Sequence, residues 1–260
     1  MVMQSPSFWL LTFTLALPVP CGWGHDVWFT ALPRLEAVQL VVHHGHPGDR
    51  EVPDPHKLFD LTIDTSLHAT SWPGRFQPEE RNGLPLLISE PLPLHGDQGL
   101  QLVGGQYDNG YWVKTEAGYR NTSKQHARQT QDSLSSMKGA KILIAVNGRV
   151  SGPYQKILGH ALEIVPQTNP FLLAPGDQWP IQVLFEGRPL AGVAVEVTDG
   201  LTPMEEDTIP RYRTKTNGMA DIPIQRSGPL LLVVDYATAG RHLDEADVDH
   251  YTATLHVMLP

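Results

Sequence analysis

The sequence predicts an all-β protein made of two β-sandwich domains. Its 23 glycines and 23 prolines break the 260 residues into short apolar runs, a pattern typical of strands joined by turns. No amphipathic helical stripe of useful length is present. Apolar and polar residues alternate over residues 251–259, which predicts a strand with one inward face. The side chains expected on the outward face of that strand are Thr252, Thr254 and His256.

Residues 1–24 are expected to be a signal peptide that directs the protein to the periplasm. The apolar core from Phe8 to Leu17 is shorter than the ~20 residues that span a bilayer and fits the central region of a secretory signal. Gly22 and Gly24 are small enough to precede a cleavage site. Cleavage after Gly24 would also remove Cys21, the only cysteine. A metal site in the mature chain would then use nitrogen and oxygen donors.

Residues 25–165 are predicted to form the N-terminal sandwich, which carries the candidate metal site. A polar stretch, residues 118–138, is interpreted as a long loop with one helical turn. The strands expected here are 37–44, 58–64, 84–89, 100–107, 111–115, 141–146 and 161–165.

Residues 166–170 are predicted to be a hinge, because Pro166 and Pro170 fix its backbone in extended conformations. The following segment, residues 171–260, is expected to be an immunoglobulin-like domain. The pair Asn217-Gly218 favours a tight hairpin between two of its strands. The strands expected here are 179–185, 193–197, 212–216, 219–224, 230–236 and 251–259.

Charge and motif content argue against several function classes. The net charge of −9 disfavours binding to nucleic acid or to anionic membranes, which both attract basic surfaces. No later stretch is apolar for long enough to insert into a membrane. The nucleophile elbow, the phosphate-binding glycine loop and the His-Glu-x-x-His motif are all missing from the sequence.

Histidines point instead to a metal site. Cleavage after Gly24 would make His25 the first residue, so that its α-amine and its ring nitrogen could chelate one ion. His44 and His46 are two residues apart and would share a strand face, whereas His43 would point to the other face. Together His25, His44 and His46 would offer three or four nitrogens, a set that suits square-planar or tetragonal Cu(II) or Ni(II). A polar pair on an edge strand is the competing interpretation of His44 and His46.

The chain has 12 histidines in all, and those outside this cluster have weaker claims to a metal. His160 is expected to be structural. His250 could supply a late ligand, although its place at a strand start favours a surface position. Solvated side chains are expected for His56, His68, His95, His126 and His242.

Motifs along the mature chain resemble a bacterial family, DUF4198, also described as the nickel uptake transporter family or the periplasmic component of cobalt/nickel transport. By this resemblance, the leading His-Asp of the family falls on His25 and Asp26, and its Gly-His element falls within His44-Gly45-His46. Val27 and the additional His43 depart from the family pattern, which leaves open which clustered imidazole is the equivalent one. The matching segments are 24–29, 42–48, 136–141, 162–166 with Asn169-Pro170, 183–192 and 251–255.

The resemblance implies a β-rich periplasmic protein that binds or delivers Ni²⁺ or Co²⁺, with a membrane metal-uptake transporter as its partner. Capture and hand-over of the ion would need no catalysed reaction. Two alternatives stay open at this point. One is a copper-binding protein or copper oxidative enzyme that uses an N-terminal histidine. The other is an adhesion or scaffold module that binds no metal.

Overall fold

The computed structural model describes residues 25–260 except 34–36, 50, 65–68, 73 and 93–98. The expected signal peptide, residues 1–24, therefore lies outside the described residues. Within them every regular element is a strand or a single 3₁₀ turn, and three sheets make up the molecule. The all-β prediction is confirmed. The 3₁₀ turns are η1 (Pro55–Lys57), η2 (Lys124–His126), η3 (Val146–Gly148), η4 (Pro170–Leu172) and η5 (Glu206–Thr208).

The first sheet comes from the N-terminal part of the chain and has the order β1-β2-β6-β5. Its strands are antiparallel, and β1 lies at one edge. This sheet carries the candidate metal site at the start of β1 and the end of β2. Its strands are β1 (Asp26–Pro33), β2 (Val38–Gly45), β5 (Phe76–Arg81) and β6 (Leu84–Ser89).

The central sheet has nine strands, with β14-β13-β16-β17-β9-β7-β3-β4 in order and β8 paired to β7. It combines strands from residues 25–165 with strands from residues 171–260. The two groups meet where β17 pairs in parallel with β9. A continuous hydrogen-bonded sheet thus joins the two predicted domains, and their division into separate sandwiches stays a prediction. The strands are β3 (Leu58–Asp64), β4 (Ala69–Ser71), β7 (Leu100–Thr115), β8 (Gly118–Arg120), β9 (Asp132–Ala145), β13 (Ala194–Thr198), β14 (Arg211–Arg213), β16 (Gly228–Ala239) and β17 (Val248–Leu259).

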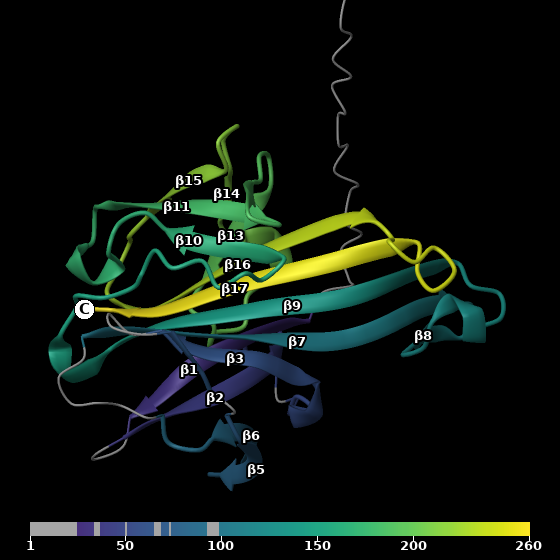
Figure 1. Cartoon of the computed structure of the whole chain (residues 1–260), viewed down its shortest axis with the longest axis horizontal. Coiled ribbons are helices and arrows are strands. Elements are labelled where there is room, and N and C mark those ends of the chain that lie inside the picture. The colour runs from purple at the N-terminus through teal and green to yellow at the C-terminus, as the bar shows by residue number, and fades with distance from the viewer. Residues whose placement is uncertain (1–24, 34–36, 50, 65–68, 73, 93–98) are drawn as a thin grey trace, which may run out of the picture.

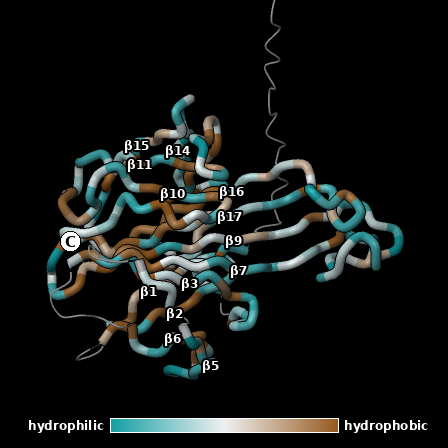
Figure 2. Tube along the Cα trace, in the orientation of Figure 1, coloured by the Kyte–Doolittle hydropathy of each residue, from teal (hydrophilic) through white to brown (hydrophobic). Residues whose placement is uncertain are grey.

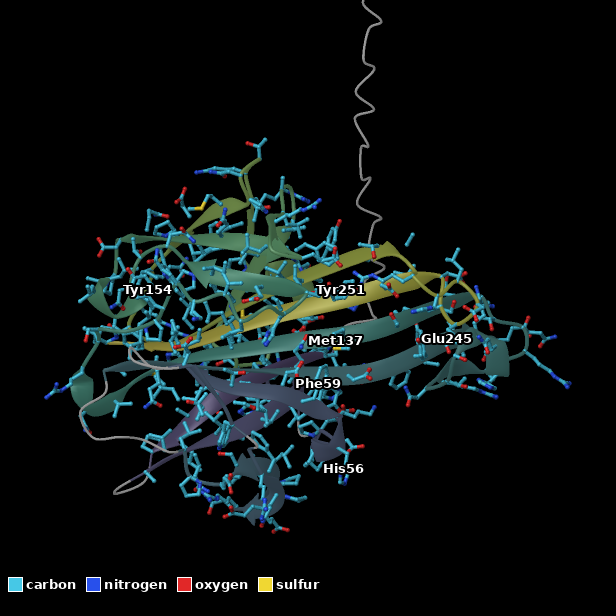
Figure 3. The ribbon with its side chains drawn as sticks, in the orientation of Figure 1. His56, Phe59, Met137, Tyr154, Glu245 and Tyr251 are labelled. Atoms are coloured by element: carbon cyan, nitrogen blue, oxygen red, sulfur yellow. The ribbon has the colours of Figure 1, made fainter. Side chains whose placement is uncertain are left out.

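The third sheet covers the other face of the central sheet, so that the molecule has three layers (Figure 1). Its central strand β11 pairs with β10, β12 and β15. The long strands β7, β9, β16 and β17 extend beyond the layered body, and Glu245 lies near the end of this extension (Figure 3). The strands of the third sheet are β10 (Leu162–Pro166), β11 (Gln178–Phe185), β12 (Arg188–Pro189) and β15 (Met219–Pro223).

Two apolar cores separate the layers, and Figure 2 shows apolar residues concentrated along the stacked strands. One core lies between the central and third sheets and includes Leu255 and Trp179, both 0% exposed. The other lies between the central and first sheets and includes Phe29 and Ile142. Alternation in β17 explains how one strand serves both layers. Its odd-numbered residues enter the core between the central and third sheets. Thr252, Thr254 and His256 lie on the opposite face and are buried there, not exposed as predicted.

Several local predictions need correction. Residues 100–115 form one strand, with a register shift near Gly110, rather than two. The predicted loop at residues 118–138 contains the expected helical turn, but β8 and the start of β9 also lie in it. A tight turn forms at Asn217-Gly218, yet the strands on either side enter different sheets, β14 pairing with β13 and β15 with β11. The hairpin prediction was therefore wrong.

Among the described residues no helix combines the length and the apolar composition that crossing a membrane requires.

Candidate metal site

Antiparallel pairing of β1 with β2 brings His25 beside the histidines at the end of β2. Asp26 pairs with Gly45, and Val27 pairs with His44, so His25 lies next to the His44-Gly45-His46 segment. The ring of His25 has its centroid 5.2 Å from that of His44 and 5.4 Å from that of His46, edge to face in both cases. The structure thus gathers all three predicted ligands in one place.

Glu51 completes this cluster, and the sequence analysis did not identify it. Its Oε2 atom lies 3.0 Å from Nδ1 of His44 and 3.2 Å from Nδ1 of His25. Potential ligand atoms of His25, His44 and Glu51 all lie within 4.8 Å of one another, a spacing that one metal ion can bridge. His46 contacts the His25 ring but is not part of this closest group. We call these four residues the histidine–glutamate site.

The site is open to solvent on one side. The side chains of His25 and Glu51 are 44% and 55% exposed, whereas that of His44 is 12% exposed. His46 is exposed as well. An ion could therefore reach the site from solution and leave it again without any large movement of the chain.

A tight turn after β2 fixes the position of these side chains. The backbone N–H of Asp49 donates to the carbonyl of His46 (2.9 Å), and the carboxylate of Asp49 accepts from the backbone N–H of His46 (2.7 Å). Gly45 adopts a φ of +112°, and a Cβ atom there would lie 2.5 Å from Oδ2 of Asp49. Only glycine fits that position without strain. The glycine between the two histidines is thus explained by the backbone path.

His44 is the most buried member of the site. Its ring lies against that of Tyr107 on β7, with 5.5 Å between the centroids. Burial lowers the pKa of His44, and the hydrogen bond to Glu51 opposes that effect. The neutral imidazole, the form that binds metals, is therefore favoured. Its Nε2 atom is buried and has no hydrogen-bond partner in the part of the chain that the structure describes.

His43 lies on the other face of β2, as its position in the strand predicts. Its ring stacks on Trp28 with 4.9 Å between centroids, and its Nε2 is 2.8 Å from Oγ1 of Thr30. Burial lowers the pKa of His43 to about 4. The structure therefore separates His43 from the histidine–glutamate site and leaves His44 and His46 beside His25.

The other described histidines lie away from the site. His160 is buried, as expected. His250 is 2% exposed, so its predicted surface position was wrong: it lies between β16 and β9 in the central sheet, with its Nε2 3.2 Å from Oδ1 of Asp235. Exposed positions are confirmed for His56, His126 and His242, and His68 and His95 lie outside the described residues.

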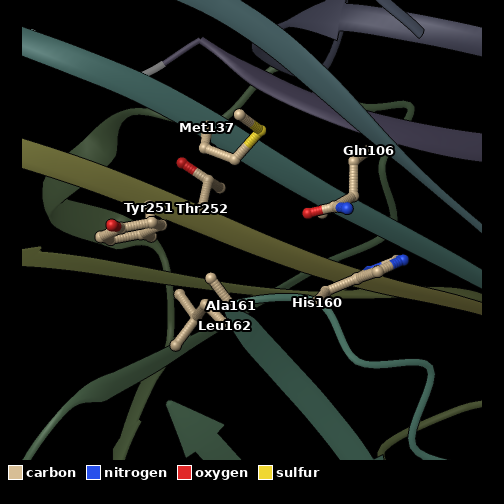
Figure 4. A pocket seen from close by; sticks show the side chains of 8 residues that line it. Gln106, Met137, His160, Ala161, Leu162, Tyr251 and Thr252 are labelled. Carbon is tan, nitrogen blue, oxygen red and sulfur yellow. The ribbon is translucent and has the colours of Figure 1, made fainter. Parts of the chain in front are cut away.

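A small pocket lies beside the central sheet, away from the histidine–glutamate site. Side chains of Gln106, Met137, His160 and Tyr251 line it (Figure 4). It has no room even for a water molecule, whereas ordinary ligand pockets begin at ~300 Å³. We assign it no ligand.

Comparison with known proteins places most of the chain within one family description. A family model described as a domain of unknown function, DUF4198, matches residues 23–238. No curated protein matches the chain.

Proposed function

The chain belongs to the DUF4198 family, and we propose that it is a periplasmic protein that binds a divalent transition-metal ion, nickel or cobalt, for capture or delivery to an uptake system. The observation that carries the proposal is the convergence of His25, His44 and Glu51, whose ligand atoms lie within 4.8 Å of one another.

The donor types favour divalent first-row metals. Imidazole suits nickel, copper and zinc, and a carboxylate adds a hard, negatively charged oxygen. Cleavage after Gly24 would add the α-amine of His25 as a further nitrogen. The set expected from the sequence consisted of nitrogen donors only, and Glu51 makes it a mixed nitrogen and oxygen set. Thiolate ligands play no part in it.

Glu51 helps to order the site. Its carboxylate accepts a hydrogen bond from Nδ1 of His44 and lies close to Nδ1 of His25. A bound metal ion would replace these contacts between the imidazoles and Glu51 with coordination bonds. The imidazoles would bind it in their neutral form. The two rings are already close, so little ordering of side chains is needed on binding.

Solvent access fits capture and release better than permanent structural binding. Structural metal sites are closed by protein ligands, whereas this site keeps an exposed side at His25 and Glu51. A carrier needs such a side for ion exchange. No catalysed reaction is required for this role.

A copper-dependent oxidative enzyme is the second candidate. The solvent-exposed position of His25 favours it, because a bulky substrate could approach the ion there. Release of oxidised oligosaccharides from a polysaccharide by the copper-loaded protein with a reductant would support the enzyme over the carrier.

Isothermal titration calorimetry on protein that begins at His25 tests the proposal. Ni²⁺, Co²⁺ and Cu²⁺ should each be titrated into wild type, into His44→Ala and into a form with one glycine added before His25. We expect one tight site per chain in wild type and large losses of affinity in both altered forms. His242→Ala removes an exposed histidine outside the site and serves as the matched control. Equal affinity in all four proteins would overturn the proposal, and unchanged affinity in the extended form alone would exclude the amine as a ligand.

A further inference from the structure

Lys138 on β9 is completely buried beneath the histidine–glutamate site. Its side chain is 0% exposed, and no described residue forms a hydrogen bond with its Nζ atom. The second buried lysine of the same strand, Lys141, points to the opposite face and forms an ion pair with Glu163. Native proteins rarely leave a buried ammonium without a partner, so its retention at one position calls for an explanation.

The register of the central sheet connects Lys138 to the site. Lys138 lies directly opposite Tyr107 in the β9–β7 pair, and the ring of Tyr107 contacts the ring of His44. On its other side Lys138 pairs with Thr252 of β17. The ammonium and the imidazole of His44 thus share one enclosed layer between the first and central sheets.

Two carboxyl groups lie on the same face of the central layer: Asp26 is buried, whereas the side chain of Asp235 is 33% exposed. Asp26 follows His25 at the start of β1, and Oδ1 of Asp235 accepts a hydrogen bond from Thr252 and lies 3.2 Å from His250. Neither forms an ion pair with Lys138 among the described residues. Burial lowers the pKa of Lys138, and the negative charges of Asp26 and Asp235 partly oppose that effect.

We propose that the buried ammonium of Lys138 limits the affinity of the histidine–glutamate site for divalent cations. The inference rests on the proposed function. Like charges repel strongly where protein excludes water, since the effective dielectric constant is far below that of bulk solvent. A fixed positive charge beneath His44 weakens binding of a second positive charge and thereby eases its release. A carrier that must give up its ion benefits from such a limit.

Replacing the ammonium should therefore strengthen metal binding. In Lys138→Met, which keeps the length and the apolar stem of the side chain, we expect Ni²⁺ to bind about tenfold more tightly, equivalent to about 1.4 kcal/mol. If Lys138 only supported the fold, its replacement would weaken Ni²⁺ binding. The melting temperature shows whether the variant keeps its fold, since loss of Lys138 also removes a positive charge that interacts with the carboxyl group of Asp26.

Lys57 provides a matched control. Its Nζ lies 5.8 Å from the centroid of the Tyr107 ring, and Lys57 is only partly buried. Solvent screens such a charge, so Lys57→Met should change Ni²⁺ affinity by less than about threefold. Comparing the two variants distinguishes the effect of the buried charge of Lys138 on Ni²⁺ affinity from that of the partly exposed charge of Lys57.

Calorimetry with Ni²⁺ on the full mature chain decides between the outcomes. Tighter binding in Lys138→Met and in the polar variant Lys138→Gln, with Lys57→Met near wild type, supports the inference. If Lys138→Met does not fold, the Ni²⁺ affinity of Lys138→Gln alone decides. Unchanged or weaker binding in a folded Lys138 variant overturns it while leaving the proposed function intact. Absence of Ni²⁺, Co²⁺ and Cu²⁺ binding in wild type would instead remove the proposed function itself.

Discussion

Nδ1 of His44 donates a hydrogen bond to the carboxylate of Glu51 at 3.0 Å across seven residues of chain. The two residues also form an isolated antiparallel bridge, so the backbone itself brings Glu51 back to the end of β2. This contact orients the imidazole toward the same point as that of His25. The histidine–glutamate site therefore depends on Glu51 as much as on its histidines.

Glu51→Gln should weaken Ni²⁺ binding by roughly 10- to 100-fold, the range typical when a group bound to or orienting a metal ligand is lost. The amide keeps the shape of the side chain but removes its negative charge and much of its strength as a ligand. Calorimetry on purified mature protein measures the change. Glu80→Gln, an exposed charge on β5, should bind as wild type does, and equal losses in both variants would point to a general charge effect instead.

Gly45→Ala should disturb the site more than the fold. A methyl group would approach Oδ2 of Asp49 to 2.5 Å at a backbone φ of +112°, so the turn that carries His46 must shift. We expect a loss of about 1–2 kcal/mol in the free energy of unfolding and a clear loss of Ni²⁺ affinity. Urea unfolding and calorimetry measure the two effects. Wild-type values for both would show that the turn does not constrain the site.

The buried ring of His256 should make stability fall in acid. Burial lowers its pKa from the ordinary 6.5 to about 4, and neither ring nitrogen forms a hydrogen bond with any described residue. Between these values the unfolded chain takes up a proton that the folded chain does not, so the free energy of unfolding decreases as the pH drops from 6.5 toward 4. The full effect is at most about 3 kcal/mol.

His256→Leu should flatten that part of the pH dependence. Urea unfolding at pH 7 and at pH 4.5, with a chelator present to remove metal, measures the difference between wild type and variant. A variant with the same acid sensitivity as wild type would assign the effect to other groups.

Thr254→Val tests how the first sheet is attached to the central sheet. Oγ1 of Thr254 donates to the carbonyl of Val27 at 2.7 Å, within a buried layer. Valine has the same shape but leaves that carbonyl without its donor, which should cost about 1–2 kcal/mol of unfolding free energy. Thr115→Val, at an exposed local hydrogen bond, should cost less than about 0.5 kcal/mol. Similar values for both would argue against a stabilising role of the Thr254 contact.

Local patterns predicted the strand content and part of the site. Alternation and turn residues located most strands, and the two-residue spacing of His44 and His46 predicted a shared face. That His25 joins them follows from pairing of β1 with β2, although the sequence analysis did not list β1 as a strand. The separation of His43 from this face also followed from strand periodicity.

Contacts between residues far apart in the sequence could not be predicted from local patterns. Glu51 follows the strand in a polar turn region, where most carboxylates are solvated, and no spacing rule links it to His44. The parallel pairing of β17 with β9 joins residues more than 100 positions apart, such as Val248 and Leu134. The apolar alternation of β17 was visible in the sequence, but nothing local indicated that its polar face would be covered by β1.

Diffraction from crystals of protein that begins at His25, loaded with Ni²⁺ and recorded at the nickel absorption edge, tests the central claim most directly. We predict one strong anomalous peak between His25, His44 and Glu51, with nitrogen and oxygen atoms at about 2.0–2.2 Å, by analogy with other first-row ions. A peak at another group of residues, or no ordered peak in crystals soaked with excess Ni²⁺, would contradict the account.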